Sequence, residues 1–72
     1  MNVQTAIISQ LQAIDSEIKS RKDKKIAKIN AEAILDNLRT IVSNNKSDAF
    51  IVNNNEKVKM ALKMAQDEIN AI

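Results

Sequence analysis

The sequence predicts an all-α fold, because glycine and proline are absent and the apolar residues recur at helical spacing. Without glycine and proline the chain lacks the usual residues of tight turns, bulges and left-handed helix ends, which disfavours a β-rich fold. Apolar residues make up 44% and charged residues 28% of the 72 residues, a balance typical of globular or coiled-coil proteins. We therefore expect a single small helical domain over residues 1–72.

The first expected helix is long and runs from about residue 2 to about residue 42. Its N-terminal part carries an a/d heptad seam spaced four, three and four, formed by Ile7, Leu11, Ile14 and Ile18. The next two seam positions are Arg21 and Lys25, so the seam stops there. Over residues 26–42 apolar side chains lie on more than one side of the helix, which predicts contacts with two neighbours.

The second expected helix is shorter and ends near residue 71. A turn over residues 43–47 precedes it, with Ser47 or Asp48 as the N-cap. It begins near residue 48 or near residue 56, depending on whether the run Asn53–Asn55 interrupts the helix or opens it. Its apolar stripe consists of Val58, Ala61, Leu62, Ala65, Ile69 and Ile72.

Two helices joined by a five-residue turn are expected to pack as an antiparallel hairpin. The N-terminal part of the first helix then extends past the end of the second and leaves its seam uncovered. Burying one such side chain is worth about 1.5–3 kcal/mol, so several exposed ones are incompatible with the small stability of a short domain. We therefore expect oligomerisation into a helical bundle or coiled coil, with Ile7, Leu11, Ile14 and Ile18 as the interface. The alternative is a break near residues 20–25 that makes a monomeric three-helix bundle.

The missing residue types also limit the chemistry of the chain. Proteins of this size often depend on disulfides, metals or oligomerisation, and a chain without cysteine or histidine has neither disulfides nor a zinc site. Glu32 and Asp36 lie one turn apart, and we interpret them as exposed acids rather than ligands of a hard cation. With no histidine, no glycine-rich loop and no serine beside an activating base, we expect neither enzymatic activity nor a cofactor.

A basic segment is the sharpest polar feature of the sequence. It consists of Lys19, Arg21, Lys22, Lys24, Lys25 and Lys28, against one acid, Asp23. Such a concentration of charge is typical of a site for nucleic acid or another anion. However, the cations point all round the helix and no aromatic residue is interleaved with them. We therefore favour an ion-paired surface.

Four acidic residues are the expected partners of this basic segment. Asp15 and Glu17 stand four residues before Lys19 and Arg21, a favourable spacing on a helix. The hairpin would also place Asp67 and Glu68 opposite residues 22 and 23 and form cross-helix ion pairs. Elsewhere, Met60 and Met64 lie one turn apart off the main stripe, where flexible thioethers suit an adaptable surface or a second packing contact within an oligomer.

Three functions are compatible with these features. The first is non-enzymatic self-association, as a structural or assembly component of a larger complex. The second is an inhibitor or adaptor that binds a host protein through a helical face. The third is binding of nucleic acid or another anionic ligand through Lys19–Lys28.

Composition also suggests a source and a location. Asn, Lys and Ile make up 29 of the 72 residues, and their AT-rich codons suggest a phage or another AT-rich mobile element. The N-terminus lacks the pattern of a signal peptide and the longest apolar stretch, residues 49–52, is far too short to span a membrane. We expect a cytoplasmic protein, or a component of a viral particle if phage-encoded, with a homo-oligomeric or helical protein partner and no membrane association.

Overall fold

The computed structural model describes residues 2–72 and confirms the all-α fold. Its helices are α1 (Val3–Ser20), α2 (Lys24–Asn44), α3 (Ala49–Asn53) and α4 (Asn55–Asn70). No strand occurs in this part of the chain. The molecule is elongated, with extents of 38 × 21 × 15 Å, which matches helices lying along one common direction.

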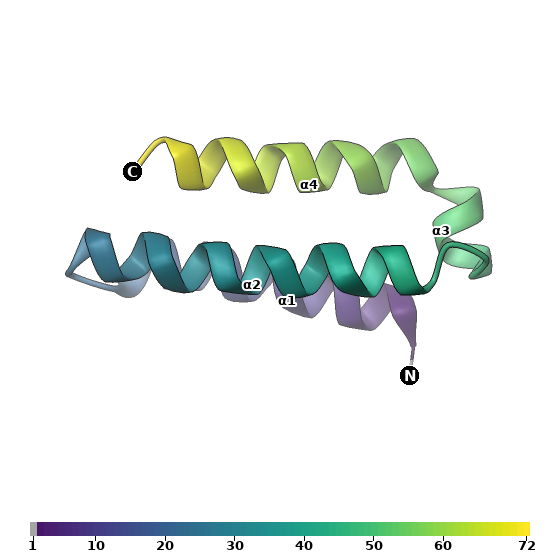
Figure 1. Cartoon of the computed structure of the whole chain (residues 1–72), viewed down its shortest axis with the longest axis horizontal. Helices are drawn as coiled ribbons and strands as arrows, with labels where there is room; N and C mark the ends of the chain where they lie inside the picture. The colour runs from purple at the N-terminus through teal and green to yellow at the C-terminus, as the bar shows by residue number, and fades with distance from the viewer. Residues whose placement is uncertain (1) are drawn as a thin grey trace.

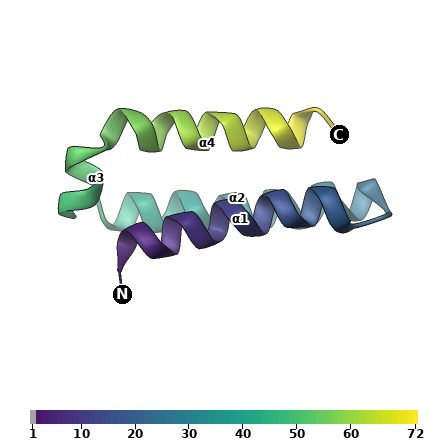
Figure 2. The same ribbon diagram turned by 180° about the vertical axis from the view of Figure 1, so that it is seen from behind.

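Three long helices form a bundle that the short α3 closes at one end (Figure 1). Helices α1 and α2 pack side by side and antiparallel, while α4 runs along them in the direction of α1 (Figure 2). The closest packing is between α1 and α2, and α4 contacts both of them. The expectation that α2 has two neighbours is therefore confirmed.

The long first helix expected over residues 2–42 is wrong. The chain leaves the helix after Ser20, where Arg21 has extended backbone angles, φ −81° and ψ 127°. A new helix begins at Lys24, so α1 folds back along α2 instead of extending past α4. This arrangement contains the break near residues 20–25 on which the three-helix alternative depended.

Side chains at the break provide hydrogen bonds that the helix ends would otherwise lack. The Asp23 carboxylate accepts the backbone N–H groups of Lys25, at 3.0 Å, and of Ile26, at 3.3 Å. The Lys24 ammonium donates to the carbonyl oxygen of Ile18 at 2.6 Å, near the end of α1. Unpaired N–H and C=O groups at helix ends are costly, and these contacts make a sharp break without glycine or proline.

The turn between α2 and α3 follows Asn44, two residues later than the end expected for the first helix, and asparagine and aspartate side chains make its hydrogen bonds. The Asn45 side chain donates to the Ile41 carbonyl at 2.7 Å, at the end of α2. Asp48, rather than Ser47, caps α3 by accepting the backbone N–H of Phe50 at 2.9 Å. The chain thereby crosses from α2 toward α4 within a few residues.

The asparagine run interrupts the second helix at Asn54. Its side-chain Nδ2 donates to the carbonyl oxygen of Phe50 at 2.9 Å, and its backbone N–H donates to the carbonyls of Phe50 and Ile51. One helix therefore begins at Ala49 and another at Asn55, close to both of the starts expected from the sequence.

The core lies between α1, α2 and α4. Its largest fully buried side chains are Ile14, Leu35, Leu38 and Ile69. Of the α4 stripe, Leu62, Ala65 and Ile69 pack in this core, Val58 is buried beside it, Ala61 is only partly buried and Ile72 is exposed. Helix α2 also carries two apolar residues outside its buried face, Ile26 and Ile29, and both are exposed.

Replacing Asp23 by Ala is expected to destabilise the fold by about 1 kcal/mol, because two N–H groups of α2 lose their acceptor. The measurement is urea unfolding followed by circular dichroism. Asp36→Ala is the matched control, since Asp36 is exposed within α2 and is not a cap. Equal stability of the two variants would contradict the role of Asp23.

Candidate interaction surface

The four α1 residues expected at an oligomer interface lie against the chain's own core. Ile7 and Ile14 are buried, with 4% and 1% of their surface exposed. Leu11 and Ile18 are partly buried and pack against the same cluster. Since α1 lies against α2 and α4, no uncovered N-terminal arm requires a second chain. Burial of this seam within the chain therefore does not support it as an oligomer interface.

The basic segment lies at the end of the bundle where α1 turns into α2 (Figure 1). Lys19 pairs with Asp15 at 3.0 Å, and Arg21 pairs with Glu17, as the spacing in the sequence predicted. Lys24 donates to a backbone carbonyl. Together with Lys19 and Arg21, three of the six cations therefore have a partner within the chain.

The expected cross-helix ion pairs with Asp67 and Glu68 do not form among residues 2–72. The prediction was wrong because it placed α4 against a continuous first helix, whereas the break alters the pairing of the helices. Lys22, Lys25 and Lys28 consequently have no ion-pair partner in the part of the chain that the structure describes.

Glu17 connects the basic end to the packing of α1 against α2. Its carboxylate binds Arg21 and accepts a hydrogen bond of 2.9 Å from the side chain of Asn30 in α2. The hydrogen bonds from Arg21 and Asn30 lower the pKa of Glu17, and the carboxylate in turn raises the pKa of Arg21. The sequence contained the Glu17–Arg21 spacing, but the partner Asn30 depends on the fold-back of α1.

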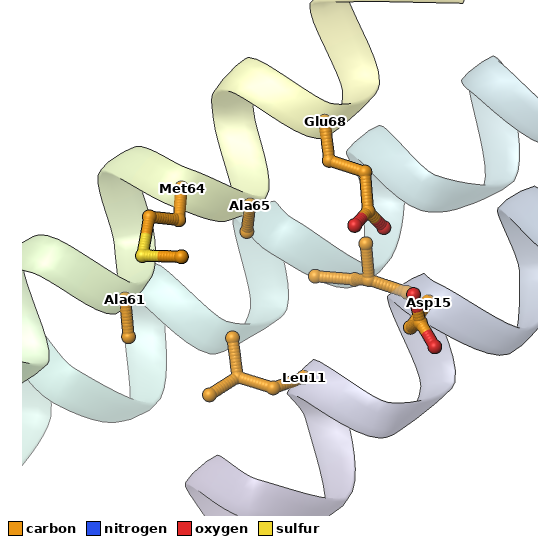
Figure 3. A pocket seen from close by; sticks show the side chains of 7 residues that line it. Leu11, Asp15, Ala61, Met64, Ala65 and Glu68 are labelled. Carbon is orange, nitrogen blue, oxygen red and sulfur yellow. The ribbon is translucent and has the colours of Figure 1, made fainter.

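An apolar cleft of about 250 Å³ opens between α1 and α4 (Figure 3). Its lining residues are Leu11, Ile14, Asp15, Ala61, Met64, Ala65 and Glu68. Figure 3 shows Leu11 of α1 facing Met64 and Ala61 of α4, with the carboxylates of Asp15 and Glu68 at one end. The cleft offers a largely apolar floor with charge at its rim, which is the character of a surface that accepts an amphipathic helix.

Exposed apolar side chains occur in the cleft wall and one helical turn away from its lining residues on both helices. Met64, in its wall, has 64% of its surface exposed, and Met60 one turn earlier has 65%. Ile8, one turn before Leu11 on α1, is exposed as well. We call Ile8, Leu11, Met60, Ala61 and Met64 the α1/α4 face. The sequence marked the two methionines, but only the packing of α1 beside α4 brings Leu11 to face Met64.

Two further kinds of feature are absent from residues 2–72. No group of three or more His, Cys, Asp or Glu side chains is arranged to hold a metal ion. None of the helices has the length and apolar character needed to cross a membrane.

Glu17→Gln is expected to remove part of the acid sensitivity of the fold. Because the folded state lowers the pKa of Glu17, its contribution to stability is present at neutral pH and is lost as the pH falls through the folded-state pKa. The stability difference between wild type and the variant should therefore shrink on acidification below about pH 4.

Urea midpoints measured across the acid range test this expectation. Glu32→Gln is the control, because Glu32 is exposed and forms no ion pair among the described residues. A wild type and Glu17→Gln variant with parallel pH profiles would contradict it.

Comparison of the chain with protein-family models, with curated proteins and with solved structures gives no match. The function must therefore be inferred from the residues and their arrangement. The two surface features available are the α1/α4 face and the basic end of the bundle.

Proposed function

We propose that this protein is a non-enzymatic helical interaction module that associates with other helices through the α1/α4 face. In the version that we favour, the protein associates with itself and serves as a structural or assembly component of a larger complex. Binding to a different helical protein, as an inhibitor or adaptor, would use the same face.

The exposed methionines beside the cleft are the observation that carries this proposal. Met60 and Met64 leave about two thirds of their surface in water, next to a cleft lined by Leu11 and Ala61. Contiguous exposed apolar groups with a polar rim are typical of sites for protein partners. Methionine is suited to such a site because its flexible thioether adapts to the contours of a partner.

The composition is compatible with an origin in a phage or other AT-rich mobile element, where small helical proteins would serve in assembly or bind host proteins. The exposed face supports association in either role. Its apolar floor and the absence of histidine and cysteine from the sequence favour binding over catalysis.

Met64→Glu is expected to abolish association, because it places a charge in the apolar wall of the cleft. Two measurements apply: the solution molar mass of the chain alone up to high micromolar concentration, and the retention of a host protein by the immobilised chain. The wild type should show a mass above 8.0 kDa, a retained protein, or both.

Ile29→Glu is the matched control, because Ile29 is an exposed apolar residue on α2 with 69% of its surface in water. It should associate like the wild type. A wild type that is strictly monomeric and retains no protein would contradict the proposed function, as would a Met64→Glu variant indistinguishable from wild type.

Binding of nucleic acid or another anion is a second candidate. The observation that favours it is the position of Lys22, Lys25 and Lys28 near the start of α2 without ion-pair partners among the described residues. Cations without carboxylate partners are available to displace counterions from a phosphate backbone. The ion pairs of Lys19 and Arg21 reduce the charge that this end offers.

If this second function operates, reversing the charge of Lys22, Lys25 and Lys28 together should eliminate binding to a fluorescent oligonucleotide. Wild-type affinity should fall steeply with salt, by about one power of the salt concentration for each phosphate contact. Reversal of Lys57, Lys59 and Lys63 on α4 controls for net charge. Salt-independent binding, or equal binding by both triple variants, would contradict it.

A further inference from the structure

Helix α4 carries a second seam outside its core stripe, and of the seam residues only Met64 lines the cleft with α1. The seam has the spacing three, four, three, four and consists of Lys57, Met60, Met64 and Asp67 of the helix and of Ala71, its C-cap. All five residues are exposed, whereas the core stripe of the same helix contains the buried Val58, Ala65 and Ile69. This is the a/d spacing by which one helix packs against another.

The charges of this seam are arranged symmetrically about its methionines. Lys57 stands three residues before Met60, and Asp67 stands three residues after Met64. Neither Lys57 nor Asp67 forms an ion pair within residues 2–72. Because one end of the seam carries a base and the other an acid, an identical seam running in the opposite direction would place opposite charges together at both ends.

We propose that the partner of this seam is a second copy of the chain, with the two α4 helices packed antiparallel about a two-fold axis that crosses the seam midway between Met60 and Met64. This inference rests on the proposed function and specifies its partner. In this register Met60 lies opposite Met64 of the second copy, and Lys57 lies opposite Asp67 of the second copy. Two ion pairs then flank a central cluster of four methionines.

Charge complementarity selects the antiparallel orientation over the parallel one. Two parallel α4 helices would place Lys57 against Lys57 and Asp67 against Asp67, and like charges placed together disfavour an interface. In the antiparallel arrangement both copies use the same patch, so no patch is left for a third chain and the assembly stops at a dimer.

The antiparallel seam is continuous with the cleft. Met64 belongs both to the seam and to the cleft wall, so the second α4 lies beside Leu11 and extends the contact onto the α1/α4 face. Specific stable interfaces bury about 800 Å² on each partner, more than one short seam provides. The contribution of α1 through Ile8 and Leu11 is therefore part of the proposal, and we expect a dissociation constant in the micromolar range.

Charge exchange across the seam tests the proposal by sedimentation equilibrium of the full chain. Lys57→Asp and Asp67→Lys each place like charges together twice in the dimer, and each should raise the dimer Kd by about tenfold or more. The double variant recreates both pairs in reverse and should return the Kd to within about threefold of wild type, as a coupled pair requires.

The two single variants are expected to fold, so misfolding would not account for a loss of dimer affinity. Lys57→Asp adds an acid near the N-terminus of α4 and Asp67→Lys adds a base near its C-terminus, and both changes favour the helix dipole. Lys59→Asp is the matched control, since it makes the same charge change at an exposed position of α4 outside the seam. It should leave the Kd within about threefold of wild type, because exposed charges away from a contact contribute little.

Engineered thiols test the orientation, since the chain has no cysteine of its own. Chains carrying Met60→Cys and chains carrying Met64→Cys should form a disulfide-linked dimer mainly when mixed, because the two positions oppose each other. Cross-linking of each variant with itself, and no gain on mixing, would overturn the antiparallel register.

Two outcomes separate this proposal from the proposed function. A monomeric wild type that retains a host protein through Met64 would overturn the second copy as the partner and leave the function standing. Self-association that Met64→Glu abolishes, but that single charge reversals do not weaken or the double exchange does not restore, would overturn the seam alone.

Discussion

The fold depends on the break between α1 and α2, where the Asp23 carboxylate accepts the first N–H groups of α2. A continuous helix through this point would carry Ile7 and Ile14 away from the rest of the chain. Because the helix ends at Ser20, α1 returns along α2 and both isoleucines become buried. The capping hydrogen bonds at this turn therefore decide whether the seam of α1 packs within one chain or between chains.

The fold class and several local features could be predicted from the sequence, because they depend on neighbouring residues. The Asp48 cap and the Lys19–Asp15 pair are each set within about one helical turn, and the core stripe of α4 is set within a single helix. The break was harder to predict, because Asp23 lies among six cations. In the sequence it is as compatible with an exposed charge on a continuous helix as with an N-cap. A heptad seam shows that a face must be covered, and it does not show which chain covers it.

The candidate site was predicted in part for the same reason. Spacing alone marked Met60 and Met64 as a pair outside the core stripe, and in the structure both are exposed and Met64 faces Leu11 across the cleft. The cleft itself depends on α1 lying next to α4, which follows only from the fold-back. The cross-helix pairs expected for Asp67 and Glu68 failed because they assumed a different helix neighbour, and Asp67 is instead left exposed in the outer seam of α4.

The most direct test asks whether the contact between α1 and α4 forms within one chain or between two chains. Ile14 and Ala65 line the same cleft, so their methyl groups should give nuclear Overhauser effects within one chain. Diluting isotopically labelled chains into an excess of unlabelled ones should leave this signal unchanged for each labelled chain. Its loss on dilution would show that α1 packs against α4 of another molecule, and would contradict the fold-back on which the structure depends.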